Sequence, residues 1–208
     1  MTTCNCGATL DGSGYHLLTC KSGGEPVWSH EAIASTWSDC LRELNVHHRR
    51  EPRHRYSNSN DRPDIVAFDL DKGCNVDLDI ALAHAWSSDI FPRSSESDCA
   101  AAERREERKK AKYAKENLPG GSTVSFIPLA IEHFGRWGEM GKNFLERLAK
   151  KSRDELGQPN AAEFLDIWRK RFSTQLQKCN AKVIMRKISA LTNHIDCTVD
   201  CSIQFFSH

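Results

Sequence analysis

The stretch RPDIVAFDLDKGCNVDLDIALA, residues 62–83, carries the strongest secondary-structure signal in the chain. Its apolar residues 65–68 predict a buried strand, and residues 69–75, which contain a Lys-Gly pair, predict a turn. From residue 76 to residue 82, apolar side chains alternate with aspartate or alanine, which is typical of a strand with one apolar face. The two strands can therefore pair as a hairpin.

Helices and further strands are predicted on both sides of this hairpin. Upstream, apolar residues at helical spacing predict a helix over 29–44, opened by Ser29 or His30, and residues 46–56 predict a strand that breaks at Pro52. The predicted downstream elements are a charged helix over 98–116, a strand over 124–131, and helices over 142–155, 161–178 and 181–191. This order predicts a mixed α/β fold followed by a helical extension.

The composition limits the classes of protein to which the chain can belong. It has 208 residues, of which 29 are Lys or Arg and 28 are Asp or Glu, so its net charge of +1 excludes a uniformly basic nucleic-acid coat. It lacks the run of about 18 apolar residues that would predict a transmembrane helix. The first residues show no secretory signal, so we expect an intracellular protein whose clustered cysteines bind metal rather than form disulfides.

Three aspartates of the hairpin suggest a metal site. Asp64 lies at the edge of the first strand, and Asp77 and Asp79 lie on one side of the second, because side-chain direction repeats every two residues. If the strands pair, Asp64 comes close to one of these two, and converging carboxylates suit Mg²⁺ or Mn²⁺. Such an ion can activate water and neutralise charge on a phosphodiester.

The charged helix that follows offers basic partners for this site. Lys109 and Lys112 share one helix face, with Tyr113 adjacent, and a lysine there can orient the attacking water or stabilise charge. A plainer interpretation stays open. In it, Asp64 caps a turn, the other two aspartates face water, and the lysines form a solvated face paired with glutamates such as Glu106.

The N-terminal segment contains a second candidate metal site. Cys4, Cys6, His16 and Cys20 supply four ligands within one short segment, and four is the number that tetrahedral zinc requires. Bound zinc would stabilise a segment that has few apolar residues. His30 is an alternative ligand, and the competing interpretation is a set of unligated cysteines in a disordered tail.

Two groups of basic residues can contact nucleic-acid phosphates. Arg49, Arg50, Arg53 and Arg55 lie on the strand that breaks at Pro52, beside the proposed acidic site, and we expect them to contact DNA. The second group lies in the C-terminal helices, where a solvated helix face is an equally good interpretation. Neither group contains a base-reading motif.

Five motifs in one order resemble a known family. They are RPDIV at 62–66, LDIAL at 78–82, a lysine-rich helix ending in KAKY at 110–113, FIPLAIEHFGRWG at 126–138, and the upstream Cys/His cluster with its following Glu51-Pro52 pair. Residues 4–150 thereby resemble the C-terminal restriction-like endonuclease region of non-long-terminal-repeat retrotransposon reverse transcriptase polyproteins. That region, which follows a CCHC zinc knuckle, belongs to the PD-(D/E)XK superfamily.

The resemblance implies a fold and a pair of metal-binding acids. The implied fold is a restriction-endonuclease-like αβββαβ core over 27–141, after a zinc knuckle-like segment at 1–26 and before a helical extension with a polar tail at 142–208. Asp64 would be the first metal-binding acid and Asp79 the second, with Asp77 as the reserve candidate.

Further site residues follow from the same resemblance. The superfamily usually has a lysine two residues after the second acid, where this chain has Ala81. Lys109 on the following helix would take its place, with Lys112 and Tyr113 completing the motif, and we expect Tyr113 to contact DNA. Glu51 would either assist at the metal or only terminate a strand.

The implied activity is that of a Mg²⁺- or Mn²⁺-dependent endonuclease that nicks or cleaves double-stranded target DNA to prime reverse transcription. The resemblance further implies a nuclear protein with bound zinc, with element RNA as a further candidate partner and no membrane. The alternative is a catalytically inactive, domesticated or decayed nucleic-acid-binding protein stabilised by zinc. Metal-dependent cleavage separates the two functions.

Overall fold

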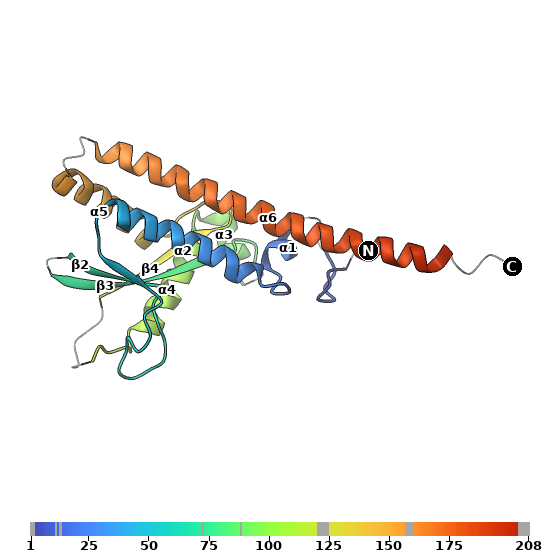
Figure 1. Ribbon diagram of the computed structural model, residues 1–208, viewed down its shortest axis with the longest axis horizontal. Helices are drawn as coiled ribbons and strands as arrows, with labels where there is room; N and C mark the ends of the chain where they lie inside the picture. The colour runs from blue at the N-terminus through green and yellow to red at the C-terminus, as the bar shows by residue number, and fades with distance from the viewer. Residues whose placement is uncertain are drawn as a thin grey trace.

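The computed structural model contains a four-stranded mixed sheet with the strand order β1-β2-β3-β4, on the left in Figure 1. The structure describes residues 3–10, 12, 14–71, 73–87, 89–119, 125–156 and 160–203. β1 pairs antiparallel with β2 and β2 with β3, whereas β3 and β4 are parallel. The strands are β1 (His48–Arg50), β2 (Ile65–Asp71), β3 (Cys74–Ala83) and β4 (Phe126–Glu132).

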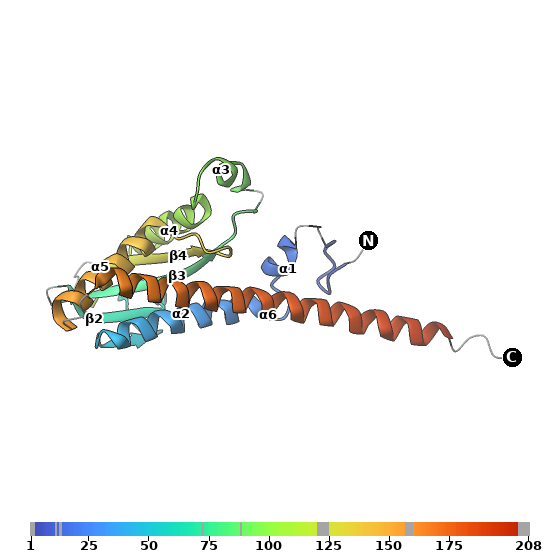
Figure 2. The same cartoon turned by 90° about the horizontal axis from the view of Figure 1, so that it is seen from above.

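Helices cover both faces of this sheet, so the predicted mixed α/β class is confirmed (Figure 2). The core side chains of α2, α5 and α6 lie on one face and those of α4 on the other. α4 belongs to the crossover that a parallel pair such as β3 and β4 requires. The helices are α1 (Tyr15–Thr19), α2 (Glu25–Glu43), α3 (Phe91–Glu96), α4 (Ala100–Tyr113), α5 (Glu139–Leu156) and α6 (Ala161–Ile203).

Several predicted helix boundaries differ from the structure. α2 begins before Ser29, because Pro26 fits the first turn of a helix, where its missing N–H is not needed. α6 is one continuous helix, whereas two were expected, since neither glycine nor proline interrupts the chain near residue 180. The short helix α3 was not expected. None of the helices in the described part of the chain is long and apolar enough to cross a bilayer.

The predicted hairpin forms, with a tighter turn than expected. β2 continues to Asp71 and β3 begins at Cys74, so both strands extend into the segment that was expected to be a turn. The expected end of the charged helix at Gly120 and Gly121, and the expected start of the next strand at Val124, lie outside the described residues.

The larger hydrophobic core lies between the sheet and α2, α5 and α6. Alternate residues of β3, such as Leu78 and Ile80, belong to it. Trp37 of α2 packs on Phe172 of α6, with ring centroids 4.5 Å apart. The largest fully buried side chains are Ile33, Trp37, Leu41, Ile65, Leu78, Ile80, Leu129, Leu145, Leu148, Trp168, Phe172 and Leu176. Bulky apolar packing therefore fixes this side of the sheet.

The opposite face of β3 is also buried. Asp77 and Asp79 are only 0% and 3% exposed, because α4 packs over this face. Alanines on both sides of the interface, among them Ala81, Ala101 and Ala130, allow the helix to approach closely. The plainer expectation that these aspartates face water is therefore wrong, and each carboxylate needs partners inside the protein.

Glu106 ties α4 to the sheet and to α5. Its carboxylate accepts hydrogen bonds from the N–H groups of Ala130 in β4, at 3.4 Å, and of Met140 and Gly141 in α5, at 3.0 Å each. A carboxylate at a helix N-terminus satisfies otherwise unpaired donors and lies favourably in the helix dipole. Burial raises the pKa of Glu106, and the three donors counteract that rise. The expected pairing of Glu106 with lysines on a solvated face is wrong.

Two glycines beside Glu106 provide a test of this anchor. A Cβ added at Gly138 would lie 2.4 Å from the Glu106 carboxyl group, whereas one added at Gly141 meets nothing closer than 3.5 Å. We expect Gly138→Ala to lower the free energy of unfolding by about 1–3 kcal/mol, because the carboxylate must leave its three donors. Gly141→Ala, inside α5, should be neutral or stabilising by up to about 1 kcal/mol. Urea denaturation of both variants measures the difference, and equal effects would contradict the anchoring role.

Candidate functional site

Asp64 and Asp79 lie opposite each other across the β2–β3 pair. The register pairs Ile65 with Leu78, so Asp64, directly before β2, lies across from Asp79 in β3. Residues at opposed positions of antiparallel strands have Cβ atoms about 5 Å apart and point to the same face. The hairpin thus brings the carboxylates of Asp64 and Asp79 together at one edge of the sheet face that α4 covers.

Asp64 is held by the backbone of β3 and by α2. Its Oδ2 accepts a hydrogen bond from the Ile80 N–H at 2.6 Å and lies 3.1 Å from His30 Nε2. The same imidazole nitrogen lies 3.1 Å from the Ile80 carbonyl oxygen. The hydrogen bond to Asp64 raises the pKa of His30, so a positive charge is favoured here. His30, expected to open a helix or replace a zinc ligand, instead lies inside α2 and contacts Asp64.

Asp79 is nearly inaccessible and is contacted by two residues of α4. Lys109 Nζ forms an ion pair with its Oδ2, and Tyr113 Oη lies 3.0 Å from its Oδ1. Burial raises the pKa of Asp79, and the nearby charge of Asp64 raises it further, while Lys109 acts in the opposite direction. His30 and Lys109 thus lie beside the two acids, and the ionised form of Asp79 is still disfavoured by burial and by its neighbour Asp64.

Asp77, the reserve candidate for the second acid, is fully occupied by other partners. Its Oδ1 accepts hydrogen bonds from Arg55 Nη2 at 2.7 Å and Nε at 3.0 Å, and its Oδ2 accepts one from Tyr56 Oη at 2.9 Å. The side chain of Asp77 is completely buried and that of Arg55 is 16% exposed. Arg55, expected to contact DNA, is thus committed to an internal ion pair, and Asp79 is the acid left beside Asp64.

Two further predicted site residues, Lys112 and Glu51, form ion pairs away from the acid pair. Lys112 Nζ lies 2.9 Å from Asp61 Oδ1 on the surface. Glu51 ends β1: its N–H donates to the Asp64 carbonyl at 2.8 Å, and its carboxylate lies 3.1 Å from Arg62 Nη2. The strand-ending interpretation of Glu51 is therefore the one that the contacts favour.

Some of the residues predicted to contact DNA are exposed, and others are bound to partners within the protein. Tyr113 is buried, with its hydroxyl between Asp79 and the Arg62 carbonyl, so the expectation that it contacts DNA is wrong. Arg50 donates to Glu31 at 2.9 Å and to Ser35 at 3.2 Å. Arg49 and Arg53 are exposed, which leaves these two accessible to a ligand.

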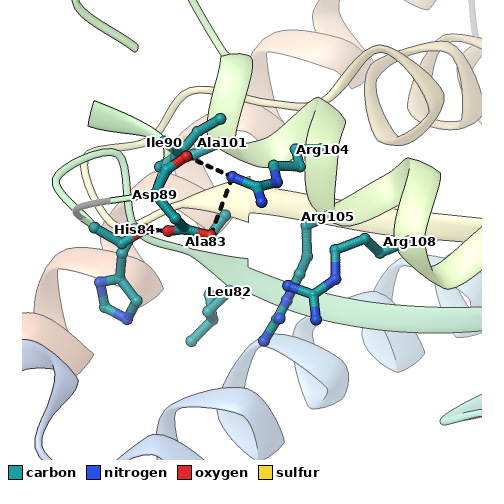
Figure 3. A pocket seen from close by; sticks show the side chains of 10 residues that line it. Leu82, Ala83, His84, Asp89, Ile90, Ala101, Arg104, Arg105 and Arg108 are labelled. Atoms are coloured by element: carbon teal, nitrogen blue, oxygen red, sulfur yellow. Dashed lines mark hydrogen bonds and ion pairs between the residues drawn. The ribbon is translucent and has the colours of Figure 1, made fainter. Parts of the chain in front are cut away.

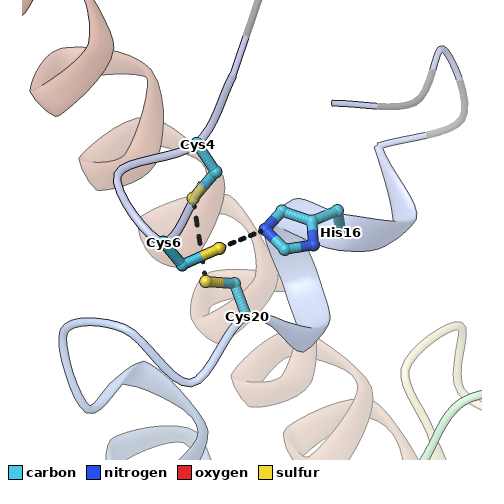
Figure 4. A group of neighbouring side chains, drawn as sticks. All are labelled: Cys4, Cys6, His16 and Cys20. Atoms are coloured by element: carbon cyan, nitrogen blue, oxygen red, sulfur yellow. Dashed lines mark hydrogen bonds between the residues drawn. The ribbon is translucent and has the colours of Figure 1, made fainter. Parts of the chain in front are cut away.

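The cysteine–histidine cluster forms as its spacing suggested (Figure 4). The ligand atoms of Cys4, Cys6, His16 and Cys20 all lie within 4.8 Å of one another. The Sγ atoms of Cys4 and Cys20 are 3.7 Å apart, and Cys6 Sγ is 3.3 Å from His16 Nε2. A tetrahedral site with Zn–S bonds of about 2.3 Å has S···S edges of about 3.8 Å, so the cluster can hold a metal such as zinc.

Local backbone geometry brings both thiols of the Cys-x-Cys pair to the cluster. Gly7, at φ +87°, allows a tight turn in which its N–H donates to the Cys4 carbonyl at 2.8 Å. Hydrogen bonds from the backbone at Cys6 and Ala8 lower the pKa of the Cys4 and Cys6 thiols, which favours the metal-binding thiolate. Burial raises the pKa of the Cys20 thiol.

A scan of the chain against protein-family models found no match, and a search of curated proteins found no significant one. The evidence for function is therefore the geometry of the side chains just described. It assembles two chemically different donor sets, one of sulfur and imidazole and one of carboxylates with a lysine.

The zinc site predicts a metal content that depends on its cysteines. Protein purified under reducing conditions should carry one equivalent of zinc, and Cys20→Ser should lose it together with part of the thermal stability. Because a cysteine thiol must lose its proton to bind zinc, acidification should also release the metal. Cys74→Ser, at an exposed cysteine in β3, is the matched control. Metal analysis that finds no zinc, or equal zinc in both variants, would rule the site out.

Proposed function

We propose that the chain contains a metal-dependent DNA endonuclease domain of the restriction-like type, as found in retrotransposon-derived proteins. The observation that supports it best is the pairing of half-buried Asp64 with buried Asp79, which Lys109 contacts as an ion pair. Apart from the short helix α3 between β3 and α4, the order α2, β1, β2, β3, α4, β4 also agrees with the αβββαβ core of that superfamily. The proposed product is a nick or break in double-stranded target DNA, from which reverse transcription can be primed.

The donor set of the acid pair fits a hard divalent cation. Asp64, Asp79 and the Ile80 carbonyl are oxygen donors, which Mg²⁺ and Mn²⁺ prefer. Asp64 Oδ2 accepts the hydrogen bond from the Ile80 N–H, so Oδ1 would be the Asp64 oxygen left to hold a metal. The raised pKa of Asp79 indicates a site where added positive charge would relieve repulsion. A bound ion would supply Lewis-acid stabilisation of the phosphodiester and lower the pKa of a water molecule.

The residues around the pair would act on the charges that change during hydrolysis. Water attacks phosphorus, the bond from phosphorus to the leaving oxygen breaks, and negative charge grows on the phosphate oxygens. The Lys109 ammonium, fixed beside Asp79, would stabilise that charge. His30 would keep Asp64 oriented by its contact at 3.1 Å. Tyr113 would hold Asp79 in place.

The alternative function is binding of nucleic acid without cleavage, and one observation favours it. Lys109 already neutralises part of the charge of Asp79 without a metal, as an inactive descendant would require. Such a protein would bind DNA through exposed Arg49 and Arg53 and would bind equally well after the acids are removed.

Nicking of supercoiled plasmid tests the catalytic roles. With Mg²⁺ or Mn²⁺, Asp64→Ala and Asp79→Ala should abolish nicking, because each removes a metal ligand. Lys109→Ala should lower the rate by roughly 10²-fold, because it removes one charge-stabilising group. The control is Asp39→Ala, an exposed residue paired with Arg42 on α2, which should nick like the unaltered chain. Retained nicking in the Asp64 or Asp79 variant would contradict the assignment.

Stability measurements separate the roles of the two aspartates of β3. Asp77→Asn breaks a buried ion pair and should cost about 3–5 kcal/mol. Asp79→Asn should be neutral or stabilising, because the folded pKa of Asp79 lies above its unfolded value. The unaltered carboxyl therefore lowers stability as pH rises from the unfolded pKa through the folded one. Mg²⁺ should raise the melting temperature of the unaltered chain but not of Asp79→Asn. A larger loss of stability in Asp79→Asn than in Asp77→Asn would reverse the assignment.

A further inference from the structure

Three arginines of α4 line a cavity next to the acid pair (Figure 3). The cavity has a volume of about 200 Å³. Its walls are the end of β3 at Leu82 and His84, the following loop around Asp89, and one side of α4. The α4 residues are Arg104, Arg105 and Arg108.

The positive charge of this cavity is only partly used by the protein. Arg104 Nη1 is fixed by the Asp89 loop, at 3.0 Å from the carboxylate and 2.7 Å from the Asp89 carbonyl. Arg105 and Arg108 are exposed and have no ion-pair or hydrogen-bond partner among the residues that the structure describes. Figure 3 shows their side chains extending from α4, with no dashed contact on either. Three arginines against one aspartate leave a net charge of +2.

A second cavity relates these arginines to Lys109, the ion-pair partner of Asp79. This cavity, of about 320 Å³, shares Leu82, His84 and Arg105 with the first and is also lined by Lys109 and Ile80. Arg105 therefore borders both, one helical turn before Lys109, which is a rise of about 6 Å along the axis. A DNA strand advances about 3.4 Å per nucleotide along its axis, so one turn of α4 corresponds to one or two nucleotides.

We propose that Arg105 and Arg108 bind a backbone phosphate of duplex DNA, one or two nucleotides from the phosphodiester at the acid site. The proposal rests on the proposed function, since it assigns a substrate contact of the same site. Guanidinium groups bind phosphate oxygens through paired N–H donors. Two arginines without a partner among the described residues supply two positive charges, which suits a phosphate better than a single carboxylate. The contact is to the backbone, so it carries no sequence preference.

The test is the salt dependence of binding to a duplex oligonucleotide, measured with a chelator present so that no cleavage occurs. Arg105→Gln/Arg108→Gln should lower the slope of log affinity against log salt by about 1, because one phosphate contact is lost, and weaken binding of unrelated sequences equally. Arg105→Lys/Arg108→Lys should restore most of the slope, because the charge returns. The matched control is Lys142→Gln/Lys150→Gln, which removes the same charge from exposed positions on α5. Its slope should change little.

Two results would overturn the proposed phosphate contact. Equal slopes for the Arg105/Arg108 and Lys142/Lys150 double variants would overturn the phosphate contact. So would affinity for inorganic phosphate that depends on the two arginines while duplex binding does not, since the cavity would then take a free anion. Plasmid nicking by the same preparations keeps the two proposals distinct. An unaltered chain that binds DNA through these arginines but never nicks with Mg²⁺ or Mn²⁺ would overturn the nuclease and support the phosphate contact.

Discussion

The packing of α4 across β3 is the constraint on which the candidate site depends. Alanines on both surfaces allow the helix to lie close to the strand, and Glu106 fixes it by accepting three backbone N–H groups. This packing removes two aspartates from water, which is costly unless each is compensated. Asp77 is compensated by Arg55 and Tyr56, and the result is a structural ion pair. Asp79 receives Lys109 and Tyr113 but also faces Asp64, and the result is a buried acid whose pKa is raised.

Neighbours of both donor sets line one cavity. Its walls include Tyr15 and Lys21 from the segment that carries the cysteine–histidine cluster, and His30 and Lys109, which contact the two acids. Tyr15 packs edge-on against His84, at the end of β3, with ring centroids 5.8 Å apart. Metal binding at the cysteines would therefore order one wall of this cavity, which Arg105 and Lys109 also line. This arrangement gives the zinc-binding segment a role in shaping the site without any contact with the reacting phosphate.

Local sequence patterns correctly predicted the features that are formed by residues close together in the sequence. The period of two over 76–82 and the short turn before it are enough to specify a hairpin, and the hairpin alone brings Asp64 to Asp79. The spacing of Cys4, Cys6, His16 and Cys20 likewise indicated their cluster. Contacts between distant segments were not predictable. Arg55 looked like a DNA contact because its partner Asp77 is 22 positions away, and His30 gave no sign of reaching Asp64, 34 positions away. Glu106 is surrounded by charged residues in sequence, so only the packed helix reveals that it is buried.

The central claim is that Asp64 and Asp79 share a divalent cation while Lys109 remains beside them. Crystals grown with Mn²⁺ and measured near the manganese absorption edge locate the ion without reference to activity. The account predicts an anomalous peak within coordination distance of a carboxylate oxygen of both aspartates, with Asp77 still bound to Arg55. Manganese bound only elsewhere, with Lys109 still closing the space beside Asp79, would contradict it and favour a protein that binds nucleic acid without cutting it.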